Sequence, residues 1–157
     1  MTATTSLVRR LVCRDPDATA VLGGRLAAAA RPGDLICLWG ELGAGKTHLA
    51  KAFGAALGVT DTIVSPSFVL MAEYAGRLPL FHLDLFRLST AADALTGGLI
   101  DDRQVLGVTL VEWPDRLADA LPVERLDVEI EGAGDEPRSI TVRAGTPALR
   151  RYLEAIE

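Results

Sequence analysis

The sequence predicts an α/β fold in three layers, with a mainly parallel central sheet to which antiparallel strands are added. Two observations lead to this prediction. Residues 35–39 form an uninterrupted apolar run, as expected of a strand that is buried on both faces. A glycine-rich loop and an Ala- and Leu-rich helical segment follow this run directly. The length of 157 residues suits one domain with a core, so we expect residues 1–157 to form a single domain.

The first third of the chain carries clear start and stop signals. Asp15 and Pro16 supply an N-cap and a first-turn proline, and Gly58 is placed as a helix C-cap. We therefore expect a strand at 6–13, a helix from Pro16 to about Ala30, a turn at 31–34, the central strand at 35–39 and a helix at 47–57.

The remainder of the chain is read from short apolar runs that turn residues separate. We expect a short strand at 62–64, a hairpin or tight connection between 68–74 and 78–85, a short helix at 89–102, a strand at 108–112, a short helix from Pro114 to about Ala120, strands at 126–131 and 139–143, and a last helix that Thr146 and Pro147 begin.

Composition excludes several functional classes. Sixteen basic against 21 acidic residues give a net charge of −5, which disfavours a broad cationic face for nucleic acid. No apolar run is long enough to span a bilayer and no leader is recognisable, so we expect a cytoplasmic protein without membrane contact. Cys13 and Cys37 lie in apolar segments without metal-ligand spacing, and we interpret both as buried thiols.

The strongest chemical signal is the loop GELGAGKT at 40–47, which matches the phosphate-loop pattern G-x-x-x-x-G-K-[ST] at every fixed position. Glycines let successive backbone N–H groups turn toward an anion, and the following helix adds its positive end. Lys46 is one of only two lysines in a chain that otherwise uses arginine. The loop therefore predicts a nucleoside triphosphate site whose contacts are Gly43, Ala44, Gly45, Lys46, Thr47 and His48.

Two acidic residues end apolar strands and are candidates for the Mg²⁺ shell or for water activation. Asp84 and Glu112 are expected beside the loop because ligands bind at the carboxyl ends of parallel strands. The alternatives are a helix N-cap or an ion pair with Arg87 for Asp84, and an exposed strand-end charge for Glu112.

Other residues near these strands have less specific signals. Ser67 follows a predicted strand and offers a hydroxyl for a switch segment, although the segment 65–67 taken alone is a turn. We interpret His82 as a packed or hydrogen-bonded core histidine and expect His48 to act through its backbone N–H. Trp113 is compatible with core, interface or a cover over the nucleotide.

These motifs, in this order, resemble the bacterial TsaE (YjeE) family of small ATPases. The resemblance covers about residues 6–143 and is carried by GELGAGKT at 40–47, SPSF at 65–68, HLDLFRL at 82–88 and VEWP at 111–114. The phosphate loop alone is widespread, whereas the last two blocks are much more specific.

The resemblance implies a three-layer P-loop NTPase fold and a Mg²⁺-dependent ATP hydrolase that is slow without its partners. The implied partners are the TsaD and TsaB proteins, which together with this subunit make the threonylcarbamoyl modification of adenosine 37 of tRNA. Contact with tRNA is then only indirect. It further implies that Lys46 and Thr47 bind phosphates and Mg²⁺, that Asp84 serves the Mg²⁺ shell, and that Glu112 orders Mg²⁺ or the attacking water, with Lys46, Asp84 and Glu112 as the catalytic residues. Thr19, Ser67 and Arg138 are implied to contact the nucleotide.

The sequence departs from the family pattern in three places. Ser67 stands where threonine is more usual, Phe86 replaces a tyrosine, and the segment 92–94 keeps one acidic residue where the family has a pair. Two alternatives to the ATPase stay open: a nucleotide-dependent binding module that does not require hydrolysis, and a small-metabolite kinase.

Overall fold

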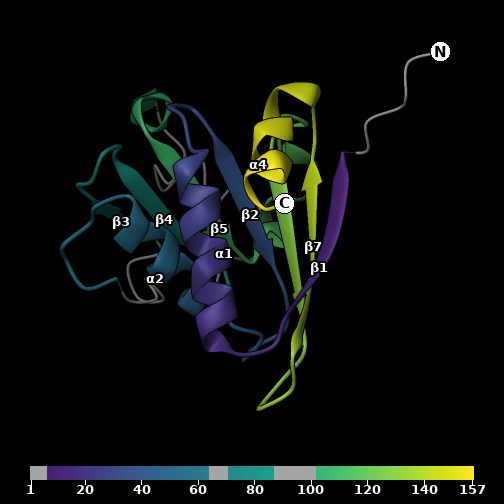
Figure 1. Cartoon of the computed structure of the whole chain (residues 1–157). Coiled ribbons are helices and arrows are strands. Elements are labelled where there is room, and N and C mark those ends of the chain that lie inside the picture. The colour runs from purple at the N-terminus through teal and green to yellow at the C-terminus, as the bar shows by residue number, and fades with distance from the viewer. Residues whose placement is uncertain (1–6, 64–70, 87–101) are drawn as a thin grey trace.

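The structure is a computed structural model that describes residues 7–63, 71–86 and 102–157 (Figure 1). Its elements are β1 (Val8–Cys13), α1 (Pro16–Ala28), β2 (Leu35–Trp39), α2 (Lys46–Ala56), β3 (Met71–Tyr74), β4 (Leu80–Asp84), η1 (Asp102–Leu106), β5 (Val108–Glu112), η2 (Pro114–Ala120), β6 (Leu126–Glu131), β7 (Arg138–Ala144), η3 (Pro147–Leu149) and α4 (Arg150–Ala155).

One sheet of seven strands, in the order β1-β7-β6-β2-β5-β4-β3, organises these elements. The four strands β6, β2, β5 and β4 are parallel, whereas β1, β7 and β3 are added antiparallel at the two sides. The predicted mainly parallel sheet with antiparallel additions is therefore confirmed. All four parallel strands end at the same edge of the sheet, where β1 also ends and β7 begins.

The two faces of the sheet are covered differently. Helices α1, α2 and α4 lie on one face (Figure 1) and enclose a large core that includes Leu26, Phe53 and Leu110. A smaller cluster on the opposite face joins Cys37, Phe81 and Val111 to Leu117 of η2 and other residues. The chain thus forms the predicted layers, and side chains alternate along β4 and β5 between the two clusters.

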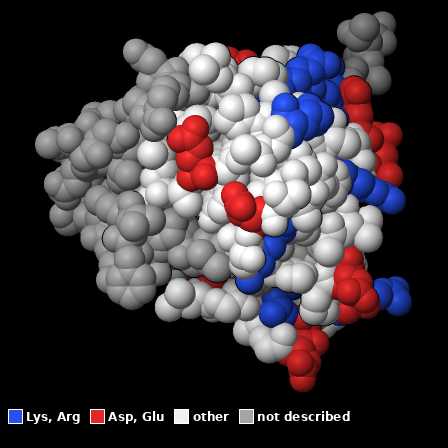
Figure 2. Space-filling view, turned by 90° about the vertical axis from the view of Figure 1, so that its left-hand side faces the viewer, with Lys and Arg blue, Asp and Glu red and all other residues white. Residues whose placement is uncertain are grey.

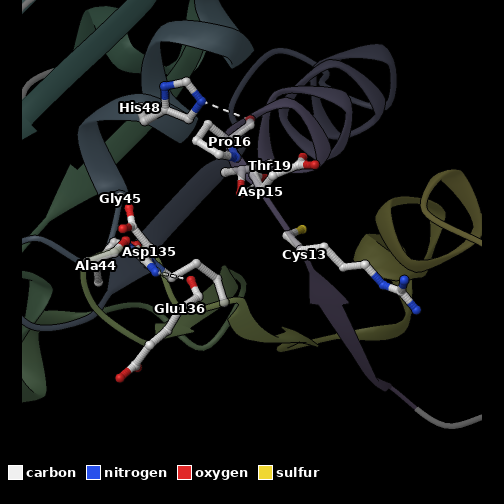
Figure 3. Close-up of a pocket in the computed structure, with 12 residues that line it drawn as sticks. Cys13, Asp15, Pro16, Thr19, Ala44, Gly45, His48, Asp135 and Glu136 are labelled. Atoms are coloured by element: carbon white, nitrogen blue, oxygen red, sulfur yellow. Dashed lines mark hydrogen bonds between the residues drawn. The ribbon is translucent and has the colours of Figure 1, made fainter.

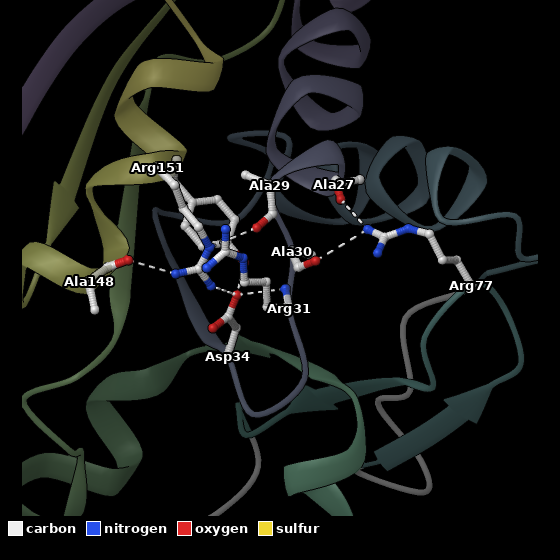
Figure 4. Close-up of polar contacts among 9 residues, drawn as sticks. Ala27, Ala29, Ala30, Arg31, Asp34, Arg77, Ala148 and Arg151 are labelled. Atoms are coloured by element: carbon white, nitrogen blue, oxygen red, sulfur yellow. Dashed lines mark hydrogen bonds and ion pairs between the residues drawn. The ribbon is translucent and has the colours of Figure 1, made fainter.

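Arginine side chains close the carboxyl end of α1, where backbone carbonyls lack helical partners (Figure 4). Arg77 donates to the carbonyls of Ala27 and Ala30, at 2.9 and 3.3 Å, and Arg151 donates to that of Ala29 at 2.9 Å. Arg151 also pairs with Asp34, which accepts from the Tyr152 hydroxyl. Burial, with the Asp34 contact second, raises the pKa of Tyr152. These contacts connect the end of α1, the residue before β2 and α4.

Most predicted elements are present, with boundaries that differ by one or two residues. The predicted strand at 62–64 is wrong for its described part, because Thr62 and Ile63 have no strand pairing. Ile63 is instead 5% exposed, and the space that a side chain on Gly54 of α2 would fill is taken by Ile63. Packing on α2 has therefore replaced sheet pairing. The predicted helix at 89–102 lies outside the described residues except for Asp102, which begins η1.

Gly23 allows α1 to approach α2 closely, and this contact generates a prediction. A Cβ atom at Gly23 would lie 2.9 Å from Ala52 Cβ and 3.1 Å from the Leu49 carbonyl, whereas one at Gly24 would lie 3.9 Å from its nearest neighbour, Ala56 Cβ. Gly23→Ala should destabilise the fold by about 1–3 kcal/mol through overpacking. Gly24→Ala should stabilise it by up to about 1 kcal/mol, because alanine favours helix.

Urea unfolding of the two variants beside the wild-type chain measures both free energies. Equal stabilities for the two variants would contradict the described helix contact.

Candidate functional site

The loop at 40–45 links β2 to α2 at the edge where the parallel strands end. Gly43 and Gly45 have φ angles of 81° and 108°, which residues with a side chain rarely adopt. A Cβ atom at either position would meet no other atom within 4 Å. Their positive φ angles turn the backbone into a concave arrangement, and open space faces both glycines. The loop therefore has the form of an anion cradle at a helix N-terminus.

Lys46 begins α2 and is 5% exposed. Its ammonium group donates to the carbonyl of Gly40 and, at 3.3 Å, to that of Glu41. Burial lowers the pKa of Lys46, and the nearby negative charges of Glu112 and Asp84 act in the opposite direction. Two loop carbonyls therefore hold the lysine inside the loop.

The indole ring of Trp113 lies against the ammonium group of Lys46. Lys46 Nζ lies 4.1 Å from the centroid of the indole ring, within the range of a cation–π contact. The ring also contacts that of Phe86: the two ring centroids are 4.9 Å apart and the ring planes are tilted by 48°. Trp113 has a φ of 60°, the one positive φ among the described non-glycine residues, which places it in the left-handed region directly after β5. Of the three roles left open by the sequence, the core role is met in part, because Trp113 is partly buried against the smaller apolar cluster, and the ring also lies against the loop lysine.

The predicted acids lie side by side at this edge. Asp84 of β4 and Glu112 of β5 are paired in register, and they are 6% and 3% exposed. Asp84 accepts the N–H of Phe86 at 3.1 Å in the manner of a cap, while Arg87 lies outside the described residues. The alternative of an exposed charge for Glu112 is wrong, because its carboxylate is buried.

Glu112 joins the loop helix to β4. Its two carboxylate oxygens lie 3.3 and 3.4 Å from Thr47 Oγ1, and His82 Nε2 lies 2.6 Å from Oε2. His82 is fully buried, as the interpretation of a core histidine required. However, that interpretation missed the direct contact of His82 with a candidate site residue. Its position two residues before Asp84, on the same face of the strand, was the available signal.

A pocket of about 400 Å³ opens beside the loop, between α1, the start of α2 and the β6–β7 turn (Figure 3). This volume lies in the range of small-ligand sites. The pocket is lined by residues from both ends of the chain, including Cys13, Thr19, Ala44, Gly45, His48 and Arg138. Because Ala44 and Gly45 line it, the pocket is continuous with the anion cradle.

Besides Ala44 and Gly45, three further residues that were expected at the nucleotide line this pocket. Thr19 is 3% exposed and its hydroxyl lies 3.5 Å from the Asp15 carbonyl. Arg138 donates to the loop carbonyls of Ala44, at 2.8 Å, and Gly43, at 3.4 Å. The His48 ring lies 3.0 Å from the Pro16 carbonyl and lines the pocket, so its side chain has a place in the site beyond its backbone N–H (Figure 3). Ser67 lies outside the described residues.

The site offers few protein ligands for a divalent cation. Among the described residues, His, Cys, Asp and Glu side chains form no group of three or more able to hold a metal ion. However, Mg²⁺ in nucleotide sites keeps several waters and needs only one or two protein oxygens beside the phosphates. Thr47 and Glu112 offer adjacent oxygens next to the cradle, so the residues fit Mg²⁺ bound together with a phosphate ligand.

One face of the molecule carries charges of both signs. On the face shown in Figure 2, Lys and Arg groups are separated by acidic and uncharged residues and do not form one continuous patch over the described part. Across residues 7–63, 71–86 and 102–157, no helix has the length and apolarity of a membrane span.

A strand, a GELGAGKT loop and a helix at the edge of a parallel sheet, beside a buried acid from the next strand, define a P-loop NTPase fold. The sequence model of the family described as "Threonylcarbamoyl adenosine biosynthesis protein TsaE" matches residues 13–140. The chain belongs to the TsaE family, which confirms the resemblance seen in the motifs.

Individual relatives agree with this assignment. The chain is 42% identical to the tRNA threonylcarbamoyladenosine biosynthesis protein TsaE of Bacillus subtilis over 131 residues, which are 83% of this chain and 82% of the relative. It is 35% identical to the protein of the same name from Treponema pallidum over 133 residues, or 85% and 98% of the two chains.

A solved structure supports the fold independently. The crystal structure of Bacillus subtilis YdiB superposes with a TM-score of 0.77 at 34% identity, and the match covers 97% of this chain and 95% of that chain.

The two cysteines are buried and unpaired, and this generates a prediction. Burial raises the pKa of the Cys37 thiol to about 12 and also raises that of Cys13, which lines the pocket. The reactive thiolate is therefore scarce in both at pH 8. Ellman's reagent at pH 8 should label neither cysteine in the folded chain and both in urea. Rapid labelling without urea would contradict this description.

Proposed function

We propose that the chain binds ATP with Mg²⁺ and hydrolyses it, acting as one P-loop ATPase domain. The observation that carries the proposal is the convergence of the anion cradle, Lys46, Thr47 and Glu112 at one edge of the sheet, next to a pocket of about 400 Å³. Lys46 and the loop amides bind phosphates, and the pocket takes the nucleoside, with Thr19, His48 and Arg138 along its wall. The hydroxyl of Ser67 is proposed to complete the phosphate side.

The buried acids Asp84 and Glu112 are proposed to serve metal binding and the orientation of water. Thr47 and Glu112 would hold Mg²⁺, with Asp84 beside them, and the chemistry that the bound ion would supply is neutralisation of charge on phosphate oxygens. Glu112 also orients the attacking water, which enters in line with the bond that breaks. Trp113 restricts Lys46 to the loop until phosphate displaces the Gly40 and Glu41 carbonyls.

We further propose that this activity serves tRNA threonylcarbamoyladenosine biosynthesis, as the names of its relatives state for those proteins. The proposed partners are TsaD and TsaB, the modified base is adenosine 37, and contact with tRNA is indirect. The acidic net charge of −5 supports an accessory role of this kind, because tight autonomous binding to a phosphate backbone needs a basic surface. A cytoplasmic location follows from that role.

The loop lysine provides the test of nucleotide binding. Lys46→Ala should weaken ATP binding by about 10- to 100-fold, because hydrogen bonds from a charged group contribute about 1.5–3 kcal/mol. Isothermal titration calorimetry measures the affinity. Lys51→Ala is the matched control, because Lys51 is the only other lysine and is exposed on α2. Unchanged affinity in the Lys46 variant would refute the site.

A second variant distinguishes an ATPase from a binding module. Glu112→Gln keeps the shape of the side chain but removes its charge, so hydrolysis should fall by at least about 100-fold while ATP still binds. The ATPase proposal predicts that tRNA modification with TsaD and TsaB falls with it. Glu129→Gln, which changes a half-exposed acid paired with Arg143, serves as the control. Full modification without hydrolysis would favour the module.

A further inference from the structure

We infer that His82 is a positioning residue for the metal-binding side of the site: it fixes the Glu112 carboxylate against Thr47 and thereby sets how tightly Mg²⁺ binds together with ATP. This inference rests on the proposed function and deepens it. It is carried by the chain of contacts His82 Nε2 to Glu112 Oε2, at 2.6 Å, and Glu112 to Thr47 Oγ1, at 3.3 and 3.4 Å.

The sheet explains why His82 reaches Glu112. In the parallel register of β4 and β5, His82 lies opposite Leu110, and Asp84 lies opposite Glu112. Side chains two residues apart share a face, so His82, Asp84, Leu110 and Glu112 all project toward the helices. The imidazole is long enough to contact its diagonal neighbour Glu112, which lies two residues beyond Leu110 on β5. His82 and Thr47 therefore hold Glu112 from two different elements.

The contact with His82 also reduces the repulsion between the Asp84 and Glu112 carboxylates. Two carboxylates directly opposite each other on one sheet face repel. Asp84 directs Oδ1 to the N–H of Phe86, at 3.1 Å, while Glu112 directs Oε2 to His82. Each acid thus has its own donor, and Glu112 stays extended toward α2. Because a carboxylate accepts, Nε2 of the imidazole carries the proton in this contact.

The contact is not explained by packing alone. His82 is 0% exposed, and its Nδ1 finds no hydrogen-bond partner among the described residues. A buried polar atom without a partner costs free energy, so an apolar side chain would fill this core position at lower cost. The benefit that offsets this cost is the orientation of Glu112. Donors behind a metal-binding carboxylate have the same effect in many metal sites, where removing one weakens metal binding about 10- to 100-fold.

Two variants separate orientation from packing. His82→Leu removes the donor, whereas His82→Gln keeps an N–H group at nearly the position of Nε2. Thr109→Val changes a buried polar residue, 5% exposed, elsewhere on β5 and controls for general loss of core polarity. Thermal unfolding first establishes the temperature range in which each variant is folded.

The readout is the ratio of ATP affinity in Mg²⁺ to ATP affinity in EDTA, measured by calorimetry. In His82→Leu this ratio should fall about tenfold, with the affinity in EDTA unchanged. In His82→Gln and Thr109→Val it should stay within about threefold of the wild-type ratio. Adding His82→Leu to Glu112→Gln should cause no further fall, because the carboxylate that His82 orients is then gone.

A second readout does not depend on nucleotide. Crystal structures of the ligand-free wild-type chain and of His82→Leu should show Glu112 in contact with Thr47 only when His82 is present. An unchanged affinity ratio in folded His82→Leu, or an equal fall in His82→Gln, would overturn the inference while leaving the ATP site intact. Absence of ATP binding by the wild-type chain would instead overturn the proposed function, and this inference with it.

Discussion

The shared direction of β2, β5 and β4 is the constraint on which the rest of the site depends. Because neighbouring parallel strands end at the same edge, the loop after Trp39 and the acids Asp84 and Glu112 arrive within one another's reach. Leu38 pairs with Glu112, and Glu112 pairs with Asp84, so one row across the sheet carries the approach to the loop and both acids. A shift of one residue in either pairing would turn an acid to the opposite face.

The two acids of this row and the loop lysine concentrate charge in a place with little water. Lys46, Asp84 and Glu112 are 5%, 6% and 3% exposed, and buried charges are costly unless they are paired or hydrogen-bonded. The protein satisfies them with loop carbonyls, the Trp113 ring, a backbone N–H, His82 and Thr47. These contacts fix the orientation of the three charged side chains relative to the loop.

The pocket beside the loop has a different origin, because its walls come from both ends of the chain. β1 pairs with β7, which brings Cys13 next to Arg138, and the close packing of α1 on α2 brings Thr19 near His48. The arginines and Asp34 at the far end of α1 hold that helix in place (Figure 4).

Local sequence determined much of this protein. The apolar run at 35–39, the GELGAGKT loop, the Asp15 cap and the hairpin around 75–77 act through nearest neighbours, and all are present as expected. The TsaE motifs likewise identified the family. The strand expected at 62–64 failed over Thr62 and Ile63 because a contact with α2 outweighed local propensity. Strand order, the pairing of β1 with β7, the pocket walls, and the contacts of His82 and Trp113 were decided only by the tertiary structure. Each depends on residues distant in sequence, whose meeting no local pattern encodes.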